Sequence, residues 1–280
     1  MEKILVTTDQ SDNSKAAIRY AIKLAEARNA ELIVLHVYHL LKPFKWSDHQ
    51  YEQYTQTFKD KTIAELGAFI KAVYDAMHEP KINYKLALYD HMDVTDGIAE
   101  YAKAHKCSYI CISTRGAGAV EKLFGTHTSG LISRSEVPVL CIPSTCHLKD
   151  LNHILYATDM TDYKNELEKI VDFARPLHAS VEMMHVSYLY EFVFDKQLME
   201  ASLKKQVNYA VSIHNRKRDI TNALLEDIDA AVKLSRPSLL VLFTHHSRSV
   251  FDKLLFDSNA EKYSFYGKVP LLTFNKRPGK

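Results

Sequence analysis

The chain has 280 residues, enough for one large domain or for two of ordinary size. Its 46% hydrophobic and 25% charged residues are typical of globular proteins, and 8 glycines with 8 prolines are too few for a low-complexity or fibrous chain. Because 36 basic side chains nearly balance 34 acidic ones, the net charge of +2 gives no electrostatic reason to expect nucleic acid or an anionic membrane as a partner.

The first residues carry no recognisable targeting signal. Residues 1–6 enter a strand-like apolar run at once, without a basic region, a long apolar region or a cleavage site of small residues. The longest apolar stretches, such as residues 32–37, are far shorter than the roughly 20 residues that a membrane-spanning helix needs. We therefore expect a soluble, cytoplasmic protein.

The first half of the chain alternates between apolar strand-like runs and helix-like stretches. The predicted strands are residues 4–7, 32–37, 82–88, 109–113 and 137–142. Near-continuous apolar strands separated by helices predict a parallel sheet with helices on both faces. We expect Ser11 or Asp12 to cap the first helix, and Thr95 to cap the helix that contains Ile98 and Ala102.

A long polar and aromatic segment, residues 43–77, separates the second and third predicted strands. Its aromatic residues are Trp46, Tyr51, Tyr54, Phe58, Phe69 and Tyr74. Their helical spacing favours an amphipathic helix, packed on its own sheet or on the other half of the chain, over an aromatic ligand-binding box.

The second half of the chain repeats the first. Three strand segments return in the same order: 3–9 as 153–159, 30–37 as 179–186, and 136–142 as 268–274. The offset falls from 150 residues at the first pair to 132 at the last, so the second copy is shorter. We interpret this as a duplication that gives two tandem open-sheet α/β domains, at residues 1–146 and 150–280.

The cysteines are Cys107, Cys111, Cys141 and Cys146, and none forms a C-x-x-C pair. Because two of them belong to a strand-like run, we expect small buried thiols and assign them no metal or redox chemistry.

A candidate binding site follows the strands of the first copy. In an open parallel sheet, ligands gather beyond the carboxyl ends of the strands, where Asp9 and Val37 are expected. The fourth strand runs into a loop whose glycines would let backbone N–H groups approach a phosphate, followed by hydroxyls just before a helix-like stretch at 131–134. These loop residues are Arg115, Gly116, Gly118, Gly125, Thr126 and Thr128. The glycines alone serve turn geometry equally well, and Asp9 is either a helix cap or a ribose ligand.

These residues resemble a known family. The Ile-Leu-Val-x-x-Asp start, Leu-His-Val in the second strand, Ser-Thr-Arg-Gly with Gly125-Thr126, and Val-Pro-Val-Leu are together similar to a tandem universal stress protein with two UspA-type domains. The resemblance covers essentially all of the chain. It implies a Rossmann-like, five-stranded parallel sheet in each domain, related to adenine nucleotide alpha hydrolases. It also implies pairing of the domains through their last strands as an internal pseudo-dimer, with a homodimer left open.

Some members of the family bind ATP through G-x2-G-x9-G-[ST]. The resemblance places adenine and ribose near Thr8, Asp9 and Val37, and phosphates at Gly116, Gly125, Thr126 and Thr128, with Mg²⁺ held through the phosphates. This chain departs from the motif twice: Ser113 stands at the first glycine, and eight residues separate Gly116 from Gly125.

The second copy lacks the glycine loop. His246 and Asp257 stand where Gly116 and Gly125 do, so we predict that this copy binds no nucleotide in the family manner, and Asp159 is expected to cap a helix. Adjacent His245 and His246 would point to opposite faces of a strand and so do not predict a metal site. We expect the repeat-related His36 and His185 to be packing residues with satisfied rings.

The leading hypothesis is a stress-associated regulatory protein that binds ATP or AMP in its first domain only. The alternative is a nucleotide-free scaffold for protein partners. An ATP-hydrolysing or adenylating enzyme is a third reading, but the turn after the first strand lacks the Ser-Gly-Gly-x-Asp-Ser-like loop of such enzymes, and no catalytic residue is assigned.

Overall fold

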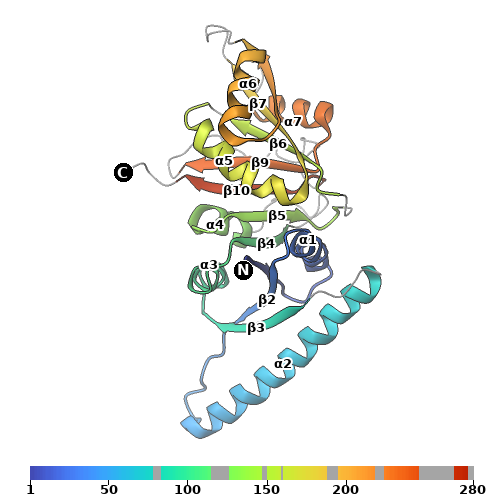
Figure 1. Cartoon of the computed structure of the whole chain (residues 1–280). Coiled ribbons are helices and arrows are strands. Elements are labelled where there is room, and N and C mark those ends of the chain that lie inside the picture. The colour runs from blue at the N-terminus through green and yellow to red at the C-terminus, as the bar shows by residue number, and fades with distance from the viewer. Residues whose placement is uncertain are drawn as a thin grey trace. The chain divides into compact units, whose positions relative to one another are not determined.

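A computed structural model of the chain describes residues 1–77, 83–114, 126–146, 150–158, 160–187, 195–217, 224–245 and 268–276. The chain divides into two compact units (Figure 1). The described residues up to Ser144 form unit 1, and those from Thr145 onward form unit 2.

Unit 1 is an open α/β sandwich. In chain order its elements are β1 (Lys3–Thr7), α1 (Ser14–Ala27), β2 (Glu31–Tyr38), α2 (Asp48–Met77), β3 (Tyr84–Asp90), α3 (Val94–Ala104), β4 (Tyr109–Thr114), α4 (Thr126–Arg134) and β5 (Val139–Pro143). The strands lie in the order β3-β2-β1-β4-β5, and each neighbouring pair is parallel. Helices α1 and α2 cover one face of this sheet, and α3 and α4 cover the other (Figure 1).

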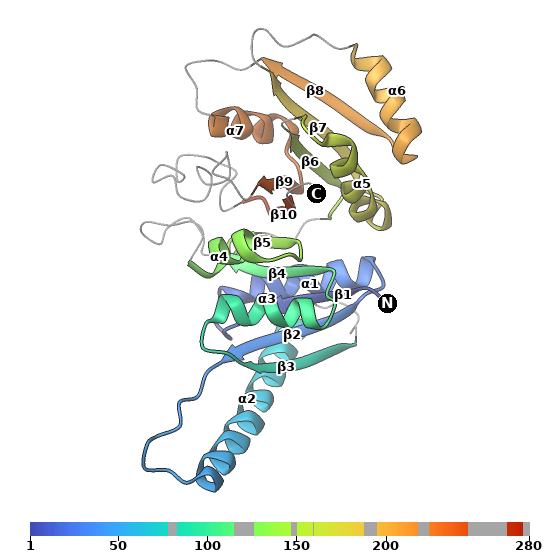
Figure 2. The same cartoon turned by 90° about the vertical axis from the view of Figure 1, so that its left-hand side faces the viewer.

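Unit 2 repeats this arrangement. Its elements are β6 (His153–Thr158), α5 (Tyr163–Ala174), the 3-10 turn η1 (Arg175–Leu177), β7 (Ser180–Ser187), α6 (Lys196–Val207), β8 (Val211–Lys217), α7 (Leu224–Ser235), β9 (Leu239–His245) and β10 (Leu271–Lys276). The parallel strands follow the order β10-β9-β6-β7-β8, with α7 on one face and α5 and α6 on the other (Figure 2). The predicted fold class, two tandem parallel-sheet α/β domains, is therefore confirmed.

The apolar runs of β1, β2, β4 and β5 form largely buried strands, as predicted, whereas β3 at the outer edge of the sheet is only partly buried. In β1 the side chains of Ile4, Leu5 and Val6 are fully buried, because a parallel sheet between two helical layers exposes neither face. Cys107, Cys111 and Cys141 are buried free thiols, and burial raises the pKa of Cys107 to about 11. The expected burial is confirmed for these three thiols, while Cys146 is only partly buried.

Both predicted helix caps are wrong. Helix α1 begins after Asn13 without a side-chain cap, since Asp12 pairs with Lys15 instead. Helix α3 is capped by Asp93, whose carboxylate accepts a hydrogen bond from the Asp96 N–H. Thr95 lies within the first turn of α3 and is buried.

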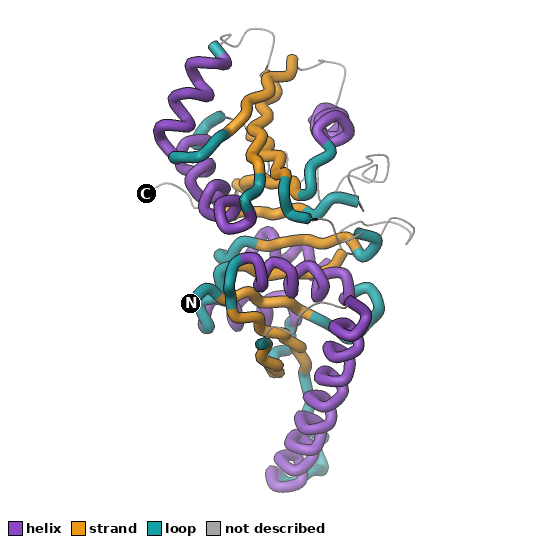
Figure 3. Tube along the Cα trace, turned by 45° about the vertical axis from the view of Figure 1, so that its right-hand side comes forward, coloured by secondary structure: helices purple, strands orange, loops and turns teal. Residues whose placement is uncertain are grey.

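The polar and aromatic segment forms α2, a 30-residue helix, as the spacing indicated. Its buried residues are Thr62, Leu66, Ile70, Val73 and Tyr74. They begin at Thr62, near the middle of the helix, and the N-terminal part of α2 continues past the sheet of unit 1 (Figure 3). The aromatic rings pair locally rather than forming a box: Tyr38 lies 5.2 Å from Phe58, and Trp46 lies 5.1 Å from Tyr54, between ring centroids.

Candidate functional site

The strand order of unit 1 reverses between β1 and β4, which is the point where open α/β sheets bind ligands. Two predicted site residues, Thr8 and Asp9, follow β1 directly at this point. Val37 lies near the carboxyl end of the neighbouring β2. The structure therefore places these three predicted residues at one edge of one sheet.

A hydrogen-bonded turn holds Thr8 in place. The Thr8 side chain is buried, and its Oγ1 lies 2.7 Å from Ser14 Oγ and accepts from the Gln10 N–H at 2.9 Å. Ser14 Oγ in turn donates to the Ser11 carbonyl at 2.7 Å. Gln10 adopts a left-handed φ of 61°, which turns the chain sharply out of the strand. Polar side chains with several local bonds thus give this turn a defined shape before any ligand arrives.

Asp9 presents a carboxylate at the surface of the same turn. Its Oδ1 accepts a hydrogen bond from the Ser11 N–H at 3.0 Å, three residues before α1 begins, so Asp9 does not cap the helix. Partial burial opposes ionisation of Asp9, but the hydrogen bonds from Ser11 and the proximity of His36 outweigh it and lower its pKa. An ionised carboxylate is an acceptor suited to ribose hydroxyls.

His36 is a packing residue with a satisfied ring, as expected. Its Nδ1 lies 2.9 Å from the Thr8 carbonyl oxygen, which fixes the end of β1 against β2.

Gly97 of α3 permits a close approach to the end of β2, because a Cβ atom at this position would lie 2.8 Å from His91 Cβ and 3.1 Å from Val37 Cγ1. The Val37 side chain therefore packs closely against α3.

Helix α4 begins at Thr126, earlier than the helix-like stretch predicted at 131–134. Thr126 and Thr128 accordingly lie in its first turn rather than before it, and Thr128 is 3% exposed. Because α4 connects two parallel strands, its N-terminus lies at the same edge as the turn after β1, where helix N–H groups favour anions. The other predicted phosphate contacts, Arg115, Gly116, Gly118 and Gly125, lie outside the described residues.

Sequence reasoning missed two neighbours of this edge. Ser113, noted only as a departure from a glycine motif, donates its hydroxyl to the Asn13 carbonyl at 2.5 Å. His127, in the first turn of α4, has its Nδ1 3.1 Å from Thr95 Oγ1. Neither contact has a local sequence signal, since the partners lie 100 and 32 residues apart.

At the corresponding edge of unit 2, aromatic rings lie near the Thr158 hydroxyl, which accepts a hydrogen bond from the Met160 N–H. Its strand order reverses between β6 and β9, and there the Phe243 ring lies 5.8 Å from Tyr156 and 4.8 Å from Phe274, between centroids. Register places Phe243 opposite Phe274 as it places Ser113 opposite Ile142. The Phe243 ring thus occupies the position that the Ser113 hydroxyl has in unit 1. The repeat residues Asp159, His246 and Asp257 lie outside the described residues.

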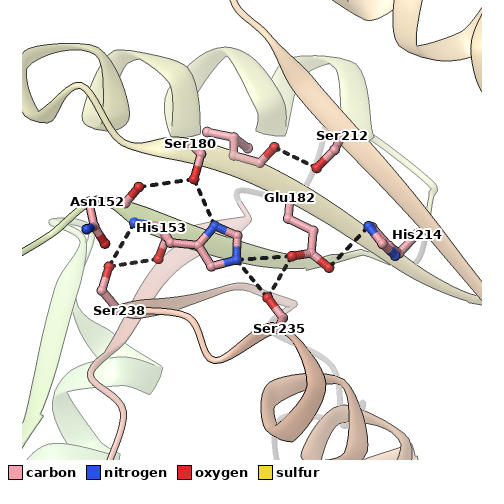
Figure 4. Close-up of polar contacts among 9 residues, drawn as sticks. Asn152, His153, Ser180, Glu182, Ser212, His214, Ser235 and Ser238 are labelled. Carbon is pink, nitrogen blue, oxygen red and sulfur yellow. Dashed lines mark hydrogen bonds and ion pairs between the residues drawn. The ribbon is translucent and has the colours of Figure 1, made fainter.

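Unit 2 also holds a polar cluster on His153, the first residue of β6 (Figure 4). His153 Nδ1 lies 2.8 Å from Ser180 Oγ, and its Nε2 lies 3.1 Å from Glu182 Oε2 and 2.7 Å from Ser235 Oγ. Ser235 donates to Glu182 Oε2 at 2.6 Å, while His214 Nε2 lies 3.7 Å from Glu182 Oε1. The cluster joins the starts of β6 and β7 to the end of α7, at the opposite edge from the strand ends discussed above.

Two classes of site find no support in the described part of the chain. No group of three or more histidine, cysteine, aspartate or glutamate side chains among the described residues could hold a metal ion. None of the described helices combines the length and the apolar character that crossing a membrane requires.

Comparison with known proteins agrees with this architecture. A curated universal stress protein from Thermus aquaticus, described as lying in the QAH/OAS sulfhydrylase 3′ region, is 29% identical over 145 residues, which are 50% of this chain and 96% of that protein. The structure of a universal stress protein from Archaeoglobus fulgidus DSM 4304 matches 98% of both chains with a TM-score of 0.69 at 19% identity. A functionally unknown protein from Pseudomonas aeruginosa PAO1 matches with a TM-score of 0.53 at 12% identity, over 98% of this chain and 92% of its own.

At these identities the two structural matches establish the fold alone. The family follows from the sequence, because the model of the universal stress protein family matches residues 1–143, just over half of the 280 residues. The chain belongs to the universal stress protein family.

Proposed function

We propose that this protein is a stress-associated regulator that binds one adenine nucleotide, ATP or AMP, at the edge of unit 1 where β1 and β4 end. The observation that carries the proposal is the difference between the two switch points. In unit 1 this point carries the buried Thr8 hydroxyl and the ionised Asp9, whereas in unit 2 it is packed with the rings of Tyr156 and Phe243. The Thr158 hydroxyl of unit 2 accepts from the Met160 N–H as Thr8 does from Gln10, so among the described residues the two units differ in the Phe243 ring that stands in place of the Ser113 hydroxyl.

The described residues fit a nucleotide. The Asp9 carboxylate would accept hydrogen bonds from ribose hydroxyls, and Val37 would contact the apolar face of adenine. The N-terminal turn of α4, with Thr128, would face the phosphates, because its N–H groups and helix dipole favour negative charge. Mg²⁺ would enter with the phosphate oxygens, since it retains water and needs few protein ligands. Contacts from Arg115, Gly116, Gly118 and Gly125 are proposed from the sequence alone.

Purified full-length protein tests this proposal. Mass spectrometry of the small molecules released on denaturation, followed by titration with ATP and with AMP, should detect an adenine nucleotide and measurable binding. Gly116→Val should abolish binding, because a side chain at a phosphate loop blocks the approach of the backbone. His246→Val, at the corresponding position of the second copy, is the matched control and should bind as wild type does.

A nucleotide-free scaffold is the second candidate function. It is favoured by the first half of α2, where residues 48–61 include no buried side chain, and by the exposed Leu41 and Phe44 just before that helix. Exposed apolar side chains of this kind suit a protein partner. Protein that is purified without nucleotide and binds none at millimolar ATP would favour the scaffold.

The proposed role is binding without chemical turnover. Asp9 accepts a hydrogen bond from the backbone of its own turn, and we assign it no role as a general base. A steady-state ATPase signal that follows the protein through purification and disappears with Asp9→Ala would contradict this part of the proposal.

A further inference from the structure

The Ser113 hydroxyl bridges two strands at the point where the strand order of unit 1 reverses. Strand β1 ends at Thr7, and Ser113 lies near the end of the adjacent β4. Its Oγ donates to the Asn13 carbonyl at 2.5 Å, and the Ile142 carbonyl of β5 lies 3.3 Å away as a second acceptor. One side chain therefore joins the turn after β1 to the ends of two neighbouring strands.

The turn receives this contact at its far end, at Asn13. Its near end is fixed within the turn by the bonds of Thr8 Oγ1 to Ser14 and Gln10. Its last residue, Asn13, precedes α1 without a side-chain cap of its own. Local backbone bonds run from the Ser14 N–H to the Ser11 carbonyl and from the Lys15 N–H to the Asp12 carbonyl, and the Ser113 hydroxyl adds a contact to Asn13 from another strand. A glycine at this position would have no hydroxyl to donate.

Unit 2 gives an internal comparison. Phe243 occupies the matching register position, opposite Phe274 of β10, and carries no hydroxyl. Its ring lies 4.8 Å from Phe274 and 5.8 Å from Tyr156, between centroids. The contact between the Ser113 hydroxyl and the Asn13 carbonyl therefore belongs to unit 1. At the matching position of unit 2, aromatic packing of Phe243 stands in its place.

We propose that Ser113 is a positioning residue of the nucleotide site: its hydroxyl fixes the turn at residues 8–13, so that Thr8 and Asp9 are already placed for the ligand. This inference rests on the function proposed above. A turn that is ordered in advance loses less conformational entropy when ligand binds, which increases affinity without a new contact to the ligand. The serine in place of a glycine is then an adaptation of this chain rather than a defect.

Full-length Ser113→Ala, Ser113→Gly and Ser113→Thr variants test this role with two measurements. Hydrogen exchange of the Gln10 and Ser11 amides, measured without nucleotide, should be faster in the alanine and glycine variants than in wild type. ATP should bind these variants about threefold to tenfold more weakly, the effect of one lost hydrogen bond. The threonine variant keeps a hydroxyl and should restore both properties.

Ser180→Ala is the matched control, because it removes a serine hydroxyl that donates to the backbone carbonyl of Asn152 in unit 2, at 3.0 Å. It should change neither the exchange of the turn at residues 8–13 nor ATP affinity. Unchanged exchange in Ser113→Ala would overturn the positioning role, as would threonine behaving like alanine. Wild-type protein that binds no nucleotide would contradict the proposed function instead, and the exchange data would still decide whether Ser113 orders the turn.

Discussion

His36 Nδ1 lies 2.9 Å from the carbonyl oxygen of Thr8, and this contact recurs in the second copy, where His185 Nδ1 lies 3.3 Å from the carbonyl oxygen of Thr158. The turns that follow are also alike, since Gln10 and Met160 both have left-handed φ angles, of 61° and 63°. The duplication has thus kept the backbone geometry of the strand ends while changing the side chains beyond them.

This pair of contacts allows a matched experiment. His36→Leu should lower the free energy of unfolding by about 1 kcal/mol, because it removes a hydrogen bond to the Thr8 carbonyl, and should weaken nucleotide binding. His185→Leu removes the equivalent bond in unit 2 and should leave nucleotide affinity unchanged. Urea denaturation and ATP titration of both variants check this. Equal losses of affinity would show that the histidine acts through overall stability and not through the edge of unit 1.

The Thr8 hydroxyl should contribute to the stability of the folded protein through the hydrogen bonds of its turn. Thr8→Val conserves shape but removes the acceptor of the Gln10 N–H and a partner of Ser14, so we expect a loss of about 1–3 kcal/mol in the free energy of unfolding. The loss is measured by urea denaturation, with Thr8→Ser as a control that retains the hydroxyl. A valine variant as stable as wild type would mean that the turn does not depend on these bonds.

Several features of the fold were predictable from sequence because they follow from the burial of consecutive residues. Ile4, Leu5 and Val6 form an apolar run that only a strand covered on both faces can bury. Because the second half of the chain repeats the first, the same reasoning predicted the second sheet. The caps were not predictable, because several polar residues stood near each helix start. Whether Asp93 or Thr95 caps α3 depends on which side chain faces the backbone N–H groups of its first turn, and the sequence does not show this.

The candidate site was predictable only in part, for the same physical reason. Thr8 and Asp9 follow β1, and Val37 lies near the end of the neighbouring β2, so parallel topology alone brings them to one edge. The Ser113 contact to Asn13 joins residues 100 positions apart, and no local pattern encodes it. The sequence predicted that the second copy binds no nucleotide because its loop lacks the glycines, and that loop lies outside the described residues, which show a different feature, the ring of Phe243.

Tyr156 should stabilise unit 2 through a buried carboxylate. Its hydroxyl donates to Glu166, which is 2% exposed, and lies 2.9 Å from Thr158 Oγ1. Tyr156→Phe removes a hydrogen-bond donor to a buried carboxyl group and should cost about 1–3 kcal/mol in unfolding free energy. A double-mutant cycle with Glu166→Gln measures the coupling. A coupling near zero would contradict a direct stabilising contact between the two side chains.

The lowered pKa of Asp9 predicts a pH dependence of stability. Its pKa in the folded state lies below the value of about 3.9 expected in the unfolded chain, so its ionised form stabilises the fold at higher pH. This contribution is present above about pH 4 and disappears as the pH falls through the folded-state pKa. The difference in unfolding free energy between wild type and Asp9→Asn should therefore shrink from about pH 5 to about pH 2. A difference that stays constant over this range would contradict the assignment.

The central claim is that only one of the two copies retains a nucleotide site. Native mass spectrometry of the full-length protein at saturating ATP counts the ligands bound to each chain. We predict one nucleotide per chain, because the edge of unit 2 is packed with the rings of Tyr156, Phe243 and Phe274. Two specifically bound nucleotides per chain would contradict the assignment of a single site to unit 1, and none would contradict nucleotide binding altogether.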